Sequence, residues 1–181
     1  DYRPKDSKLY AVGFMGNIYT LNPSTGVATF VKKLIAEPTD TTDGNAAFST
    51  ILGDANLITV NFNPVADRLR VITNTGQNLR INVDTGATIT DGAINLAAGS
   101  ATVVAGAYTN AFAGTSSTKL YSIDQNSDRV YLQNANAGTL GSSAVLGADI
   151  NTNGGGALDI DPVSNIGFAA LKLTTGAYKF F

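Results

Sequence analysis

Short apolar runs recur along the chain, and each is bounded by glycine, asparagine, aspartate or proline. Three of them begin with a basic residue and a leucine, at residues 8–13, 68–73 and 119–124. Runs of this length that are rich in β-branched and aromatic residues are typical of β-strands, and the polar residues between them are typical of turns. No stretch keeps a 3.6-residue apolar stripe with capping residues at its ends. The pattern predicts an all-β protein with less than about 10% helix.

These runs belong to a larger repeat. Twelve residues after the leucine at the start of each run lies a second apolar residue: Leu21, Ile81 or Leu132. A turn that ends in glycine comes next in each copy, and a bend of the form Asp/Asn-x-x-Pro precedes copies one, two and four. The repeat predicts one domain, residues 1–181, made of four units. Their approximate bounds are 1–56, 57–102, 103–156 and 157–181.

Each unit can form only a small antiparallel sheet, which cannot bury both of its faces alone. Neighbouring units must therefore cover one another. Two arrangements meet this requirement: a closed, β-propeller-like ring of about four antiparallel sheet units, and an open stack of the same units. The pattern favours the ring.

Two arginines stand out in the second hairpin. If the chain turns at residues 74–76, Arg70 lies directly opposite Arg80. Two like charges in this position are unfavourable by about 0.2–1 kcal/mol, so a negative group is expected nearby: Asp67, Asp84 or a carboxylate of the next unit. The favoured interpretation is an ion-pair network between units. The alternative is an anionic ligand, such as a uronic acid or sulfate, held by the two guanidinium groups.

The same register places aromatic residues in the other two hairpins. Tyr10 is expected opposite Thr20, and Tyr121 opposite Tyr131. Cross-strand aromatic residues stabilise a sheet by packing, which is the favoured interpretation. On an exposed face, the same rings would suit stacking on sugars.

The residues of most hydrolytic and redox sites are missing. The chain has no histidine and no cysteine, which excludes Ser-His-Asp and Cys-His catalysis and thiolate or imidazole metal ligands. No phosphate-binding Gly-x-x-x-x-Gly-Lys motif occurs. Glu37 is the single glutamate, and most aspartates stand at turn positions, where they cap the backbone. We therefore expect no enzyme and no cofactor.

One loop has a partial calcium pattern. Asp124, Asn126 and Asp128 place oxygen side chains at alternate positions, as calcium loops do. A complete loop would continue with glycine and later a bidentate glutamate, but Arg129 and Val130 follow instead. A plain hairpin turn is favoured, and chelators are not expected to unfold the protein.

Composition and charge restrict the partners. The net charge is -2, with 14% charged residues, which opposes nucleic-acid binding because that requires a basic surface. No apolar run approaches the roughly 18–20 residues of a membrane span, so membrane insertion is not expected. Sparse charge with abundant Gly, Ala, Asn and Thr is typical of bacterial extracellular proteins, and the opening residues 1–4 resemble a processed mature chain. We expect a secreted or cell-surface protein.

Residues 62–86, 91–93, 107–110 and 120–124 together resemble a bacterial family catalogued as domain of unknown function 4394. The resemblance covers nearly the whole chain in the expected order. It implies a secreted or surface-attached β-propeller-like domain and no activity, because the family has no assigned catalytic residues. The chain departs from the family pattern at residues 171–176, which join two strands that the family keeps apart.

The two ends of the chain suggest assembly. The first unit lacks the apolar strand that precedes the bend in the other units, which leaves a sheet edge open for pairing. The last residues form a β-prone aromatic tail that includes Tyr178, Phe180 and Phe181. We expect this tail to fill the gap, either within one chain or in the next chain of a homo-oligomer or filament.

Three functions remain open. The leading hypothesis is an extracellular structural or assembly domain that associates through its terminal strands. The second is a carbohydrate-binding module for an extracellular glycan, whose candidate residues are Tyr10, Tyr121, Tyr131, Arg70 and Arg80. A carboxylate-dependent glycoside hydrolase is a distant third.

Overall fold

The structure is a computed structural model that describes residues 1–40, 46–54 and 57–181. The described residues form strands joined by turns and loops and contain no helix, so the predicted all-β class is confirmed. The strands are β1 (Leu9–Gly13), β2 (Asn17–Leu21), β3 (Ala28–Lys33), β4 (Ile35–Ala36), β5 (Ile58–Asn63), β6 (Arg68–Thr73), β7 (Asn78–Ile81), β8 (Ala87–Thr90), β9 (Val103–Tyr108), β10 (Leu120–Asp124), β11 (Arg129–Gln133), β12 (Leu140–Val145), β13 (Gly156–Ile160), β14 (Gly167–Lys172) and β15 (Tyr178–Phe180).

The strands form four sheets, in which almost every strand pairs with its neighbour in sequence. Sheet I has the order β1-β2-β3, sheet II β4-β8-β7-β6-β5, sheet III β12-β11-β10-β9 and sheet IV β13-β14-β15. All pairings are antiparallel except that of β4 with β8. Residues 35–36, assigned to the first unit by the sequence, therefore belong to sheet II. The predicted boundary at residue 56 lies outside the described residues.

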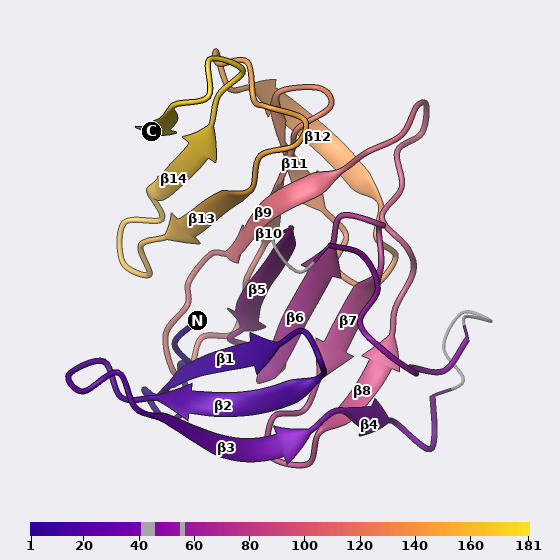
Figure 1. The fold of residues 1–181 in the computed structure, drawn as a ribbon, viewed down its shortest axis with the longest axis vertical. Helices are drawn as coiled ribbons and strands as arrows, with labels where there is room; N and C mark the ends of the chain where they lie inside the picture. The colour runs from indigo at the N-terminus through magenta and orange to yellow at the C-terminus, as the bar shows by residue number, and fades with distance from the viewer. Residues whose placement is uncertain (41–45, 55–56) are drawn as a thin grey trace.

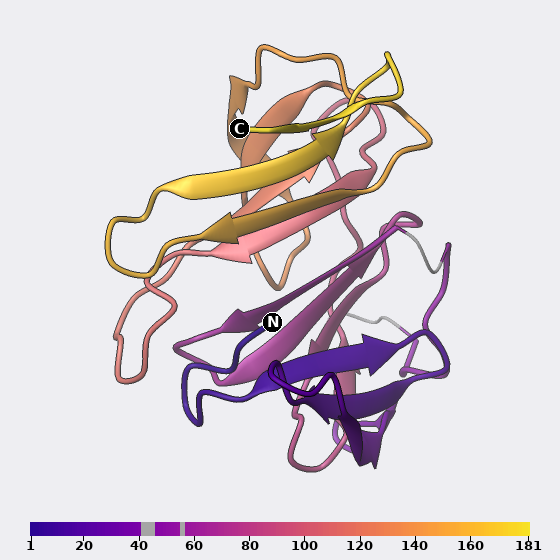
Figure 2. The same ribbon diagram turned by 60° about the vertical axis from the view of Figure 1, so that its left-hand side comes forward.

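The sheets follow one another in an arc, from sheet I in indigo to sheet IV in gold (Figures 1 and 2). Within the arc, β9 lies beside both β5 and β13. Three clusters of buried apolar side chains join sheet I to II, II to III, and III to IV. Among the described residues no such cluster joins sheet IV to sheet I, so the arrangement seen here is an open series of sheets.

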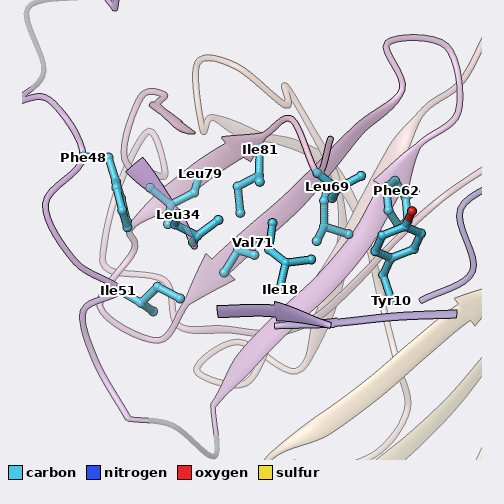
Figure 3. Close-up of a cluster of buried hydrophobic side chains, with 11 residues drawn as sticks. Tyr10, Ile18, Leu34, Phe48, Ile51, Phe62, Leu69, Val71, Leu79 and Ile81 are labelled. Atoms are coloured by element: carbon cyan, nitrogen blue, oxygen red, sulfur yellow. The ribbon is translucent and has the colours of Figure 1, made fainter. Parts of the chain in front are cut away.

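Each inner sheet has a forward face, which packs on the next sheet of the arc, and a rear face, which packs on the preceding one. The first cluster shows the principle: Tyr10 and Ile18 of sheet I meet Phe62, Leu69 and further residues of the rear face of sheet II (Figure 3). Strand residues alternate between the two faces. The forward face of sheet IV and the rear face of sheet I have no neighbouring sheet within the described chain.

The registers of the first two hairpins are those predicted. Tyr10 faces Thr20, and Arg70 faces Arg80. The predicted register of the third hairpin is wrong by one residue, because Tyr121 faces Leu132, and Tyr131 faces Ser122. This hairpin has a longer loop: residues 125–128 separate the pair Asp124–Arg129, whereas residues 14–16 close the first hairpin. The last loop residue, Asp128, adopts a left-handed φ of 54°.

The C-terminal tail corrects a second prediction. Its strand β15 pairs with β14 of its own sheet, with Phe180 opposite Ala170 and Tyr178 opposite Lys172. The chain reverses at Gly176, whose φ of 87° suits glycine, so residues 171–176 are the end of one strand and a tight turn. The tail thus does not fill the first unit of its own chain. Residues 1–2 lie along β1 instead, through a bridge between Tyr2 and Leu9.

Candidate functional site

The two opposed arginines share one carboxylate. An Arg70 guanidinium nitrogen lies 2.6 Å from Asp91, and one of Arg80 lies 2.9 Å from it. Asp91 is buried in the loop that follows β8. The prediction of a negative partner is therefore confirmed, although the residue is neither Asp67 nor Asp84 and belongs to the same unit rather than the next one. Its position in the loop after β8 carries no strand periodicity, so sequence reasoning missed it.

Arg70 also ties sheet II to sheet III. Its Nε donates a hydrogen bond to the hydroxyl of Tyr108 on β9, and another nitrogen donates to Asn136 in the turn between β11 and β12. A further bond joins it to Asn78 of β7. The side chain is only 3% exposed. The ion pairs with Asp91 lie within the second unit, and the link to sheet III consists of hydrogen bonds from Arg70 to uncharged groups. The favoured interpretation is thus right about an ion-pair network but wrong about the ion pairs joining two units. These bonds leave the Arg70 guanidinium no access to a ligand.

Asp67 and Asp84 serve a second such site, between sheets I and II. The buried guanidinium of Arg3 binds both carboxylates, with N–O distances of 2.6 to 2.7 Å. These hydrogen bonds from Arg3 lower the pKa of both carboxyls below their ordinary value and raise the pKa of Arg3. Sequence reasoning missed Arg3, and the one available signal was the bend at residues 1–4, which the second unit repeats.

The three tyrosines that were candidates for sugar binding differ in how exposed their side chains are. Tyr10 packs edge-on against the ring of Phe62 at a centroid distance of 5.5 Å, and Tyr131 is buried between sheets II and III. Neither presents a ring to solvent for sugar stacking. Tyr121 is half-buried and lines a hollow of about 320 Å³ together with Lys119. It remains a ligand candidate.

The weak calcium candidates are occupied by hydrogen bonds of the protein. Asp124 is buried and accepts from the backbone of Thr102 and Asn126 and from the hydroxyl of Ser127. Asp128 accepts from the backbone of Ile150. These bonds hold a hairpin turn in place. No group of three or more His, Cys, Asp or Glu residues in the described part of the chain could hold a metal ion.

A groove of about 590 Å³ opens beside β11. Its walls carry amide, hydroxyl and ammonium groups, from Asn63, Thr118, Lys119, Gln133, Asn134 and Ser142. The Gln133 carbonyl oxygen accepts from Ser122, whereas its buried Nε2 has no hydrogen-bond partner among the described residues. The groove therefore offers a mixed lining, in which these polar groups and one positive charge stand beside apolar side chains such as Leu120 and Leu132.

Two of the three predicted assembly residues, Tyr178 and Phe180, lie on an uncovered surface, whereas Phe181 pairs through its backbone with Ala169 and is not part of it. Phe168, Tyr178 and Phe180 share the forward face of sheet IV with Ala170, and all three aromatic side chains are exposed. At the other end of the arc, a hollow of about 320 Å³ borders Tyr2 and Leu9 on the rear face of sheet I. Each end of the arc thus carries an apolar sheet surface. No described helix has the length and apolarity needed to cross a membrane.

Comparisons with known proteins identify a family and distant structural likenesses. The model of a family described as "Domain of unknown function (DUF4394)" matches residues 1–180. No curated protein matches. A structure titled "Structure of U3-55K" is similar at a TM-score of 0.48 and 13% identity, over 100% of this chain and 50% of that chain. A computationally designed protein, Ika4, is similar at a TM-score of 0.42 and 12% identity, over 96% and 84%.

Proposed function

The chain belongs to the DUF4394 family, a family of unknown function, and we propose that it is a non-enzymatic extracellular structural domain that self-associates. It acts through the two uncovered sheets at the ends of its arc. The repeat of small sheets provides the architecture for this role, because each sheet can pack on another sheet. The absence of histidine and cysteine from the sequence supports the non-enzymatic part of the proposal.

The forward face of sheet IV carries the proposal. Phe168, Tyr178 and Phe180 form an aromatic surface on one side of a three-stranded sheet, and Phe180 is 82% exposed. Soluble proteins rarely leave contiguous apolar patches uncovered, and such patches mark sites of association. The opposite face of the same sheet is buried against sheet III through Ala169 and Leu171. Sheet IV therefore packs on the rest of the chain without using the exposed rings.

Sedimentation velocity of the 181-residue chain over a range of concentrations tests this function. We expect oligomers in the parent protein and their loss in Phe180→Asp, which places a charge at the centre of the aromatic surface. The matched control is Val163→Asp, because Val163 is 90% exposed but lies in the turn between β13 and β14. This control should associate like the parent. A parent chain that stays monomeric at every concentration contradicts the proposal.

The groove beside β11 supports a second function, the binding of an acidic extracellular glycan. Its amide and hydroxyl lining suits sugar hydroxyls, and Lys119 suits a carboxylate or sulfate. Lys119 also lines the hollow of Tyr121, whose half-buried ring could stack on a sugar. Calorimetric titration with acidic and neutral oligosaccharides tests it. Lys119→Ala should weaken binding of the acidic series at least tenfold, about 1.4 kcal/mol, and the control Lys172→Ala should not. Equal binding by both variants would rule out this groove.

A further inference from the structure

We infer that sheet IV of one copy packs face to face on sheet I of a second copy, in the register that joins the sheets inside the chain. In this contact Phe168 of one copy lies against Tyr2 of the other. The inference rests on the proposed function and specifies its partner and geometry. It differs from pairing along a strand edge, which would involve β15 and the backbone.

Equivalent positions recur in all four sheets. The residues Tyr2, Phe62, Tyr108 and Ile160 each lie opposite the first or second residue of the next strand of their sheet, namely Leu9, Leu69, Leu120 and Gly167. Residues directly opposite one another point to the same face, so the first four share the rear face. The next residue along each second strand points forward. These forward residues are Tyr10, Arg70, Tyr121 and Phe168.

At the first two of the three interfaces inside the chain, the forward residue of one sheet meets the rear residue of the next. Tyr10 of sheet I packs edge-on against Phe62 of sheet II, at 5.5 Å between ring centroids. Arg70 of sheet II donates a hydrogen bond to the hydroxyl of Tyr108 of sheet III, at 3.3 Å. The same pair of positions thus makes the contact at two successive interfaces. Phe168 and Tyr2 are the residues that would make it between sheet IV and sheet I.

Burial separates the inner copies from the terminal ones. Phe62 is 0% exposed and Tyr108 2%, whereas Tyr2, at the equivalent position, is 51% exposed. Tyr10 is 5% exposed, whereas Phe168 is 59% exposed. Both halves of an aromatic contact are therefore present in the described chain, and each is uncovered. Covering the exposed part of both rings removes apolar surface from water and so favours association.

The rear surface of sheet I has room for a neighbour. The hollow of about 320 Å³ there is lined by Tyr2, Leu9 and Leu21 together with polar residues such as Thr20 and Asn22, and it can receive an aromatic side chain such as Phe168. The glycines at equivalent turns of sheets I, II and III also indicate that the rear side of sheet I is uncovered. A Cβ on Gly86 or Gly138 would collide with a backbone carbonyl of the preceding part of the arc, whereas one on Gly26, at the equivalent position, would meet no atom within 4 Å.

A second copy of the chain is the occupant that these observations favour. The forward face of sheet IV and the rear face of sheet I are variants of surfaces that already fit each other at the inner interfaces, and one chain carries one of each. Contact between two different surfaces of identical chains is head-to-tail. It closes into a ring if the rotation permits and otherwise builds an open filament.

Cross-linking tests the geometry, because the natural chain has no cysteine. Tyr2→Cys and Phe168→Cys are made as separate variants, mixed, and treated with a short bis-maleimide. Separate variants exclude a cross-link within one chain. We expect a cross-linked dimer that contains one copy of each variant, in excess over the two homodimers. The control mixture uses Met15→Cys with Phe168→Cys, since Met15 is 80% exposed but lies in the turn between β1 and β2.

The outcomes separate this inference from the proposed function. Enrichment of the Tyr2–Phe168 cross-link over the Met15 control supports the inference. Oligomers in sedimentation without that enrichment overturn it and leave self-association standing, through another surface. A chain that is monomeric in sedimentation overturns both. As an independent measurement, Phe168→Asp should weaken the Kd of association at least about tenfold, while its circular-dichroism spectrum remains that of the parent.

Discussion

Arg70 on β6 lies directly opposite Arg80 on β7, and the buried carboxylate of Asp91 pairs with both guanidinium groups. The arrangement turns an unfavourable cross-strand pair into a connection between sheets, because Arg70 also binds Tyr108 and Asn136 of sheet III. A position that the sequence offered as a ligand site thus holds two sheets together.

Removing the shared carboxylate should therefore be costly. Asp91→Asn leaves two opposed cations without a counter-charge in a buried site, and we expect a loss of about 3–5 kcal/mol in the free energy of unfolding. Urea denaturation measures it. The control is Asp149→Asn, a change of the same kind at an exposed position. Equal midpoints for the two variants would show that the Asp91 pairs contribute nothing.

Arg3 should make the stability of the protein sensitive to acid. It lowers the pKa of Asp67 and Asp84 in the folded state, whereas in the unfolded chain both return to about 3.9. The stabilisation is complete above that value and is lost as the pH falls through the lowered folded pKa. The difference in stability between the parent and Arg3→Gln should therefore shrink between about pH 5 and pH 2. Thermal melts at several pH values measure it, and a constant difference contradicts the assignment.

Two turn glycines offer a matched pair of substitutions. Gly26 and Gly138 both have a φ of 72°, so alanine at either position costs about 1–2 kcal/mol of backbone strain. Only at Gly138 would the added Cβ also collide with the carbonyls of Gly92 and Ala93. We expect Gly138→Ala to lower the free energy of unfolding by at least about 2 kcal/mol more than Gly26→Ala. Similar losses of unfolding free energy in the two variants would mean that the backbone around Gly92 and Ala93 shifts at little cost to accommodate the added Cβ.

Chelators should leave the protein folded. The oxygen atoms of Asp124 and Asp128 already accept hydrogen bonds from the chain, and no metal is needed to hold their turn. The melting temperature should be the same in EDTA as in added calcium. A drop of many degrees in EDTA would reveal a metal-dependent fold.

The sequence was informative where the repeat was regular. Alternation and turn residues predicted the repeated hairpins of sheets I, II and III and placed Arg70 opposite Arg80. The register failed in the third hairpin because a loop one residue longer shifts every later pairing, as Tyr121 opposite Leu132 shows. Apolar pattern does not report loop conformation, and the left-handed φ of Asp128 has no clear signal of its own.

Contacts between units were the least predictable. Asp91 and Arg3 lie in connecting segments, and their partners are distant in sequence: Arg3 binds Asp67 and Asp84 across 64 and 81 residues. The tail was misplaced for a related reason. Its aromatic residues predict a strand, but only the turn at Gly176 determines that this strand pairs with β14.

The arginine sites also imply that the arc is unevenly stable. A buried charge pair joins sheet I to sheet II, and the buried guanidinium of Arg70 donates hydrogen bonds from sheet II to sheet III. The link from sheet III to sheet IV includes the neutral pair Asn110–Asn165 and a small cluster around Ala105 and Ala169. Sheet IV should then open as a separate cooperative unit, and its amides should exchange with solvent first. A partner bound to the forward face of sheet IV would slow that exchange by mass action. The exchange rate of the sheet IV amides would then report whether the partner is bound.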